Sequence, residues 1–299
     1  MMTIREYKRA ESLEEAWQLN QKKPNRILGG MIWLKMETIN VGTAIDLSGL
    51  GLDTIEENEE GFSIGAMVTL RQLEQHPGLA AYTHGAMREA VRHIVGVQLR
   101  NTATVGGSIY GRFGFSDVLS AFLALDSYVE LTGAGRVPLA EFVDMGYVRD
   151  VIERVVVVKH DYRASYEAMR KAATDFPSLN VTAAWWDNSW HVTVGARPLR
   201  ATLLQGEACG LVSERPSEDE LRALAASVRA LSYGTNLWGS AEYRRRISAP
   251  LAVQAVRRAA GIELSASLAR ELEGVQVPKF ATDEYSCRRV PGVDSSEVR

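Results

Sequence analysis

The chain has 299 residues, 46% of them hydrophobic, and a formal net charge of −3, which is typical of a globular protein large enough for two domains. This charge balance gives no electrostatic reason to expect a nucleic-acid partner, and the two distant cysteines, Cys209 and Cys287, cannot form a disulfide framework, a zinc site or an iron–sulfur cluster. This cysteine usage indicates a cytoplasmic protein. No apolar run approaches the roughly 20 residues that a membrane span needs, so we expect no membrane contact.

The first part of the chain alternates strands and helices around glycine-containing turns. Ser12 and Glu15 form a capping-box pattern that predicts a helix, and a short strand at residues 26–28 runs directly into Gly29-Gly30. Further strands and helices are predicted by their apolar periodicity, the strands at 44–47, 62–66, 127–131 and 154–158 and the helices at 70–76, 85–94 and after Asp117. The pattern predicts an α/β or α+β domain over residues 1–160.

The pattern changes after residue 160. A helix is predicted near residues 165–173, followed by strands at 179–186 and 190–196 that the polar turn Asp187-Asn188-Ser189 joins as a hairpin. Helices at 217–231 and 241–260 complete a smaller α+β domain with a three-element sheet over residues 161–262. Residues 263–299 contain two prolines and scattered charges without periodicity, and we expect an extended tail there.

Residues 100–117, RNTATVGGSIYGRFGFSD, are the segment most indicative of ligand binding. Glycine loses more backbone entropy on ordering than any other residue, so a loop this rich in glycine makes a poor core but lets the backbone approach a ligand. Gly106 and Gly107 allow the dihedrals of a nest, in which successive N–H groups point at a phosphate. Groups that can bind phosphate, ribityl or sugar oxygens come from Thr102, Thr104, Ser108, Ser116 and Asp117.

A second glycine pair, Gly29-Gly30, also follows a predicted strand. One pair alone is explained by a tight turn, whereas two pairs far apart in the sequence are better explained by two loops that converge on one diphosphate. Neither GxGxxG nor GxxxxGKS/T occurs, which argues against a Rossmann NAD site and a nucleoside triphosphate site.

Other candidate sites are weaker. The five histidines are isolated and no HExxH motif occurs, so we expect no metal site. Neither a GxSxG elbow nor a Cys–His arrangement supports nucleophilic catalysis, and we predict no catalytic side chain. Trp185, Trp186 and Trp190 are expected to pack within the hairpin.

Four segments in order carry a resemblance to a known family. They are ILGG at 27–30, IGAMVTL at 64–70, RNTATVGGSI at 100–109 with Ser116-Asp117, and GSAEYRRR at 239–246. Together they resemble the FAD-binding subunit of the molybdenum hydroxylases, the group of xanthine dehydrogenase, carbon monoxide dehydrogenase and nicotinate dehydrogenase. The resemblance covers about residues 4–260, and TATVGGSI with the later Ser-Asp is its most specific part.

The resemblance implies an α+β fold: an FAD-binding domain of the vanillyl-alcohol-oxidase type in two subdomains, then a small domain typical of carbon monoxide dehydrogenase flavoproteins. It places Tyr110 and Val155 near the isoalloxazine ring and Asp117 near flavin-side hydroxyls, while Ser116 belongs to the Ser-Asp pair of the motif. The YRR of Tyr243 to Arg245 is expected to be structural. The pyrophosphate and ribityl chain would contact Leu28, Gly29, Gly30, Met31, Ile32, Trp33, Leu34, Thr102, Thr104, Val105, Gly106, Gly107, Ser108 and Ile109.

The resemblance also implies a function. FAD would be bound non-covalently, since no His or Cys stands in the glycine loops for a covalent link, and the chain would be the electron-transfer subunit of a larger enzyme. The molybdenum cofactor would lie on a large molybdopterin subunit and the iron–sulfur clusters on a small subunit, with NAD or another molecule as electron acceptor. Two alternatives remain open: a stand-alone FAD-dependent oxidoreductase of the same fold, and a flavin-free scaffold subunit.

Two departures from the family pattern concern flavin contacts. Relatives commonly have Gly-Gly-Thr-Asp-Leu where this chain has Gly29 to Trp33, so a threonine hydroxyl contact is missing. Some relatives have a lysine where this chain has Glu167, and a cation facing the ring would then come from Arg170 or Lys171.

Overall fold

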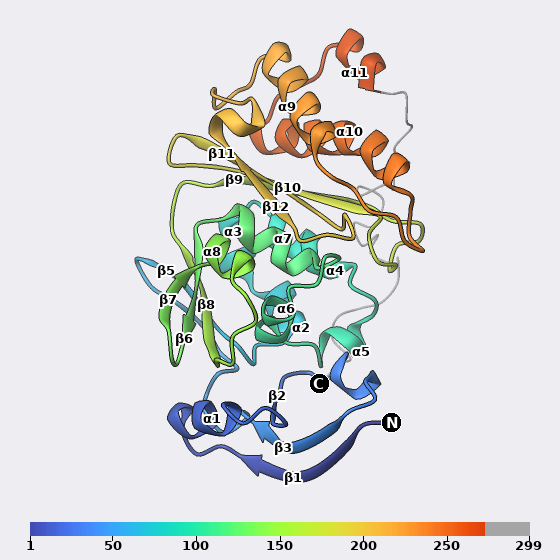
Figure 1. Ribbon diagram of the computed structural model, residues 1–299. Coiled ribbons are helices and arrows are strands. Elements are labelled where there is room, and N and C mark those ends of the chain that lie inside the picture. Colours follow the sequence, from blue (N-terminus) through green and yellow to red (C-terminus); the bar gives the residue numbers. More distant parts are fainter. Residues whose placement is uncertain (273–299) are drawn as a thin grey trace, which may run out of the picture.

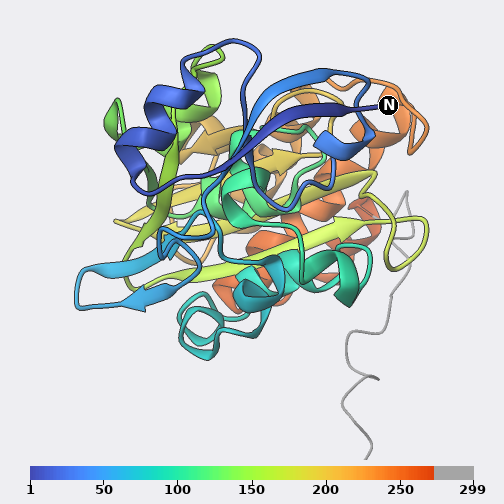
Figure 2. The same cartoon turned by 90° about the horizontal axis from the view of Figure 1, so that it is seen from below.

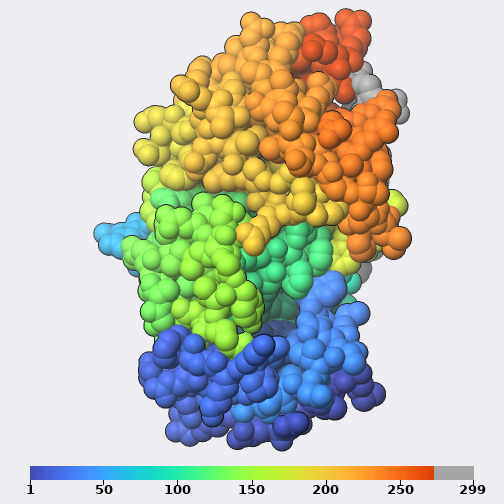
Figure 3. Space-filling model, viewed as in Figure 1, coloured from blue at the N-terminus to red at the C-terminus, as the bar shows by residue number. Residues whose placement is uncertain are grey.

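The computed structural model describes residues 1–272, and the chain begins with a small parallel sheet at one end of the molecule (Figure 1). Strands β1 (Thr3–Arg9), β3 (Asn40–Asp46) and β2 (Arg26–Leu28) pair in the order β1-β3-β2. Ser12 caps helix α1 (Leu13–Asn20) by accepting from the Glu15 amide, as predicted, but the Glu15 carboxylate accepts from the Glu11 amide at 2.7 Å, so only half of the predicted capping box forms. A short 3₁₀ helix, η1 (Leu34–Met36), follows the glycine pair. We call residues 1–48 the N-terminal subdomain, which forms one end of the molecule (Figure 3).

The next part of the chain, residues 49–160, forms the middle subdomain around a five-stranded antiparallel sheet. Two sequence features explain these strands. In β6 burial alternates, with Val129 and Leu131 inside, and central β8 contains a run of valines. The sheet order is β4 (Ile55–Glu57), β5 (Gly61–Gly65), β8 (Ile152–Val158), β6 (Ser127–Leu131) and β7 (Gly135–Pro138). The helices are α2 (Leu70–Gln75), α3 (Pro77–Tyr82), α4 (Ala86–Arg92), α5 (Val97–Arg100), α6 (Val105–Tyr110), α7 (Asp117–Ala124) and α8 (Leu139–Asp144).

Residues 161–272 form the C-terminal domain, in which helices cover one face of an antiparallel sheet (Figures 1 and 2). The other face of this sheet packs on α4 and α7 of the middle subdomain, so that Tyr166 of the sheet lies in the same core as Phe122. The strands are β9 (Arg163–Met169), β10 (Leu179–Trp186), β11 (Ser189–Gly195) and β12 (Thr202–Gln205), in the order β12-β11-β10-β9. The helices are η2 (Gly206–Cys209), α9 (Glu218–Ala230), α10 (Ala241–Ala260) and α11 (Ala266–Leu272).

The hairpin between β10 and β11 confirms the predicted strands and turn region. Asp187 and Asn188 both have positive φ, of 47° and 55°, which is the conformation of a two-residue turn that matches strand twist. Trp185 and Trp190 lie on paired positions of the hairpin and pack against each other, as expected.

The structure corrects three predictions for the second half of the chain. The helix predicted near residues 165–173 is strand β9, which pairs antiparallel with β10 and buries Tyr166 between the two domains. The sheet has four strands instead of three, because β12 adds to β11. Residues 266–272, the start of the predicted tail, form α11, while residues 273–299 lie outside the described part of the chain.

Candidate functional site

The structure brings the two glycine pairs together, as predicted. Gly29-Gly30 follows β2 of the N-terminal subdomain, and Gly106-Gly107 lies in the first turn of α6 in the middle subdomain. A Cβ atom on Gly30 would lie 2.1 Å from the Thr102 carbonyl oxygen, and one on Gly29 would lie 2.9 Å from Thr104 Oγ1. Only glycine permits this approach of the two backbones.

The predicted nest at Gly106-Gly107 is wrong. Both glycines are helical, and their amides are used within the protein: Gly106 N donates to the Ala66 carbonyl at 2.9 Å and Gly107 N to Thr104 Oγ1 at 3.2 Å. A Cβ atom on Gly106 would lie 2.7 Å from Ala66, so this glycine serves close packing of α6 on the chain after β5. Around Gly107, apart from its chain neighbours and the backbone of its own helix, only Thr104 Oγ1 among residues 1–272 comes within 4 Å of such an atom, at 3.0 Å.

The open side of Gly107 faces a cavity of about 120 Å³ between the N-terminal and middle subdomains, which we call the cradle cavity. Among the predicted site residues, its lining includes Leu28, Gly29, Thr104, Gly106, Gly107 and Tyr110. The sequence reasoning missed Asn20, Arg26, Ile27, Leu47, Ala66, Met67, Tyr147, Asp150 and Ile152. The wall is therefore mainly apolar with a few polar groups, as in small-molecule sites generally.

Unused backbone donors stand next to the cradle cavity. Within residues 1–272, the amide N–H groups of Gly30 and Met31 donate to no acceptor, and Met31 has a left-handed φ of 55°. Tyr147, which also lines the cavity, is 70% exposed, and its ring packs edge-on against that of Tyr110, at 5.9 Å between centroids. The Tyr110 hydroxyl donates to the Val148 carbonyl at 2.6 Å. Glycine backbones, free N–H donors and an aromatic rim are features that fit a dinucleotide.

Several predicted contact residues do not line the cradle cavity. Thr102 and Ser108 donate their hydroxyl groups to helical carbonyls, of Gln98 and Thr104 respectively. Val155 is fully buried in the middle of β8, and Ile152 at the start of that strand reaches the cavity instead. The remaining residues outside the lining are Gly30, Met31, Ile32, Trp33, Leu34, Val105, Ile109, Ser116 and Asp117.

Asp117 lies in a buried network that joins the two domains. Its carboxylate accepts from Tyr166 Oη at 2.5 Å, Asn180 Nδ2 at 2.7 Å and Arg170 Nη2 at 2.9 Å, all from the C-terminal domain. Burial, followed by the nearby Asp117 carboxylate, raises the pKa of Tyr166 well above its usual value. Ser116 caps α7 by accepting from the Leu119 amide. The network holds the C-terminal domain on α7.

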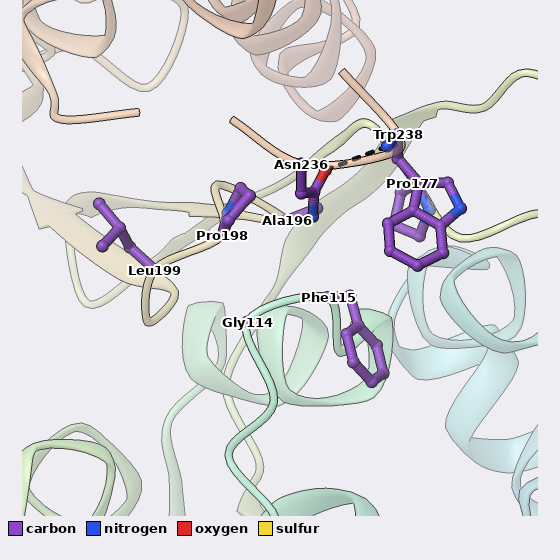
Figure 4. A pocket seen from close by; sticks show the side chains of 8 residues that line it. All are labelled: Gly114, Phe115, Pro177, Ala196, Pro198, Leu199, Asn236 and Trp238. Atoms are coloured by element: carbon purple, nitrogen blue, oxygen red, sulfur yellow. Dashed lines mark hydrogen bonds between the residues drawn. The ribbon is translucent and has the colours of Figure 1, made fainter. Parts of the chain in front are cut away.

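A second hollow, of about 180 Å³, lies where the middle subdomain meets the C-terminal domain (Figure 4). In this view Asn236 and Trp238 lie above and Gly114 and Phe115 below, and Asn236 Oδ1 accepts from the Trp238 amide at 3.1 Å. Its other lining residues are Gly114, Pro177, Ala196, Pro198 and Leu199. Trp33 contacts Phe113, Phe115 and Phe176 next to this hollow, with ring centroids 5.3–5.9 Å apart.

Arg244, in the middle of the YRR of Tyr243 to Arg245, has a structural role, as expected. Arg244 is fully buried and donates to carbonyl groups of the loops around it, including Ser178 at 2.7 Å and Gly234 at 2.9 Å. Its guanidinium therefore holds together the loops at the end of the C-terminal sheet. Within residues 1–272, no cluster of His, Cys, Asp and Glu could hold a metal ion, and no helix is long and apolar enough to cross a membrane.

Comparison with known proteins agrees with the geometry of the cradle cavity. Residues 2–159 match the family model of the FAD-binding domain in molybdopterin dehydrogenase. The chain is 24% identical over 278 residues to the glyceraldehyde dehydrogenase medium chain of Sulfolobus acidocaldarius, covering 85% of this chain and 98% of that protein. It is 25% identical over 264 residues to the nicotine 6-hydroxylase medium subunit of Paenarthrobacter nicotinovorans, covering 80% and 91%.

The fold also has solved counterparts. A chain of reconstituted CO dehydrogenase from Oligotropha carboxidovorans superposes with a TM-score of 0.77 at 20% identity, over 87% of this chain and 99% of that one. This likeness includes the C-terminal domain, which lies beyond the residues that match the family model.

Proposed function

This chain belongs to the family of FAD-binding domains in molybdopterin dehydrogenases, and on that premise we propose that it passes electrons through FAD within a larger enzyme. It is a flavoprotein of the oxidoreductase class, the medium subunit of a molybdenum hydroxylase. The observation that carries the proposal is the meeting of the two glycine pairs at the cradle cavity.

The residues of the cradle cavity would hold the dinucleotide part of FAD. Gly29 and Gly107 let the ligand approach the backbone, while the amides of Gly30 and Met31 are free to donate to phosphate oxygens. Ile152 and Tyr110 would pack on its apolar parts. When bound, the flavin supplies the redox chemistry, accepting and releasing electrons, and the protein supplies binding and orientation. The other predicted contacts, including that of Asp117 with flavin-side hydroxyls, stay predictions.

The source of the electrons lies on other chains under this proposal. Cys209 and Cys287 are the only cysteines in the sequence, too few to ligate an iron–sulfur cluster. Two relatives are named medium chain or medium subunit, which supports an assembly with a large molybdenum-bearing subunit and a small iron–sulfur subunit. Electrons would pass from the clusters to FAD and leave to NAD or another acceptor.

The flavin content of the purified full-length chain tests the proposal. We expect a visible absorption spectrum with flavin bands and no iron–sulfur shoulder, and release of one FAD per chain on acid precipitation, since the link is non-covalent. A chain that neither retains FAD nor rebinds it when FAD is added would contradict the proposal and favour a scaffold role. Flavin that stays with the precipitated protein would contradict the non-covalent link.

A further inference from the structure

An arginine that belongs to none of the sequence motifs lines the cradle cavity. Arg26 is the first residue of β2, three positions before Gly29. Its Nη1 donates to the carbonyl groups of Lys23 at 2.7 Å and Asn25 at 2.8 Å. Within residues 1–272, its Nε and Nη2 groups donate to no acceptor. The Arg26 side chain is therefore held in place by Nη1, while its Nε and Nη2 groups remain available as hydrogen-bond donors.

A second arginine lies next to it. Nη2 of Arg149 donates to the same Asn25 carbonyl oxygen at 2.9 Å, and its Nε donates to the Asn20 carbonyl at 2.5 Å. Two guanidinium groups therefore share one carbonyl oxygen. Neither of them forms an ion pair with an acidic side chain of residues 1–272. Two like charges held this close repel each other, and an anion near both would offset that repulsion.

Asp150, the one acidic side chain among residues 1–272 that lines the cavity, does not offset these charges by an ion pair. The Asp150 carboxylate is buried and accepts from three backbone amides, those of Gly133, Ala134 and Val151, at 2.8–2.9 Å. These bonds direct it toward the β6–β7 turn. Lys22 and Lys23, both exposed, add positive charge beside Arg26.

We propose that Arg26 binds the diphosphate of the dinucleotide in the cradle cavity, an inference that rests on the proposed function. The planar guanidinium fork matches phosphate oxygens bidentately, and the free amides of Gly30 and Met31 supply further donors. The Asn25 side chain keeps the segment in place, since its Oδ1 accepts from the Thr43 amide at 2.9 Å. Arg149 acts as a positioning residue through the shared carbonyl oxygen.

Titration of the full-length chain with FAD and with ADP tests this assignment. ADP carries the diphosphate without the flavin, and adenosine carries neither. We expect Arg26→Gln to weaken FAD and ADP binding about tenfold or more, with a smaller salt dependence than the wild type has. Arg26→Lys keeps the positive charge but lacks the planar guanidinium. Its affinity for FAD and ADP should therefore lie between those of Arg26→Gln and the wild type. Arg5→Gln, an equal charge change on exposed β1 of the same subdomain, is the matched control and should bind as the wild type does.

The other possible results of these titrations either overturn the role of Arg26 or separate it from the flavin function. Equal ADP affinity in Arg26→Gln and wild type would overturn the inference and leave the flavin function standing if FAD still binds. An equal loss for adenosine would show that Arg26 shapes the cavity without binding phosphate. A wild type that binds ADP through Arg26 but not FAD would keep the assignment of Arg26 and overturn the flavin function. Thermal unfolding of each variant shows whether the N-terminal subdomain stays folded.

Discussion

The two glycines of the second pair have different surroundings, which predicts different effects of the same substitution. Gly106 packs against Ala66, so Gly106→Val forces the chain after β5 apart and should lower the free energy of unfolding by roughly 1–3 kcal/mol. Gly107 faces the cradle cavity, and Gly107→Val should leave the fold stable but abolish FAD retention by filling the ligand's space. Unfolding curves and bound flavin, measured on both variants, separate the two effects. Full flavin stoichiometry in Gly107→Val would make this glycine purely structural.

Asp117 offers a second prediction at the scale of one side chain. Asp117→Ala leaves the buried Arg170 guanidinium without its carboxylate, which typically lowers the free energy of unfolding by about 3 kcal/mol. The control is Asp126→Ala, which removes the partly exposed pair with His160. This variant should lower the free energy of unfolding by less than about 1 kcal/mol. Denaturant unfolding of both variants measures the difference. An unchanged FAD dissociation constant in Asp117→Ala would contradict its predicted contact with flavin hydroxyls.

Sequence reasoning found the glycine pairs because a strand running into two glycines is a local pattern, and the pairs do meet. It missed Arg26 and Ile152 because their place in the cavity wall depends on how β8 approaches β2 across the subdomain boundary. It wrongly predicted a nest at Gly106, since the same glycine composition also suits close helix packing. The close contact with Ala66 and the hydrogen bonds made by the amides of Gly106 and Gly107 distinguish the two explanations.

At the scale of elements, β9 shows how packing overrides local preference. The segment SYEAMRKAA is rich in residues that favour helices, which is why a helix was predicted at 165–173. The structure pairs residues 163–169 with β10 and buries Ala164 and Tyr166 against the middle subdomain. Local helix and strand propensities do not include this burial, because it depends on packing against the rest of the chain. Segments with unambiguous patterns were predicted at their observed bounds, as β6, β10 and α10 show.

The contact between β9 and α10 predicts a pH dependence. Burial raises the pKa of Glu167 to about 7, although Arg258 of α10, 2.9 Å away, partly offsets this. A carboxyl group whose pKa is raised on folding stabilises the folded state only while protonated, so that contribution is full below about pH 4.5 and lost as the pH rises to about 7. Glu167→Gln, which cannot ionise, should therefore be more stable than the wild type at pH 8, by at most about 3 kcal/mol.

Urea unfolding of wild type and Glu167→Gln at pH 8 and at pH 4.5 measures this effect. The advantage of Glu167→Gln should vanish at the lower pH, where both side chains are neutral. A variant that is less stable at pH 8 would mean that the Arg258 ion pair outweighs the burial of the charge.

At the scale of the whole molecule, the C-terminal sheet is enclosed on both faces by this chain's own helices, α4 and α7 on one side and α9 and α10 on the other. Two cores meet at that sheet, and the C-terminal domain superposes together with the flavin-binding part on a CO dehydrogenase chain. Both faces of the sheet are used within the chain, so we expect a partner subunit to contact other surfaces of the molecule.

The last prediction is that this chain is an incomplete enzyme. The flavin must receive electrons from a donor, and the chain lacks both the cysteines for a cluster and, within residues 1–272, any cluster of side chains for a metal. The isolated chain should hydroxylate no purine, pyridine or aldehyde, and at most oxidise NADH slowly with an artificial acceptor. Purification from the native host should recover it with one large chain and one small, cysteine-rich chain. A monomer that turns over an organic substrate unaided would instead make it a stand-alone oxidoreductase.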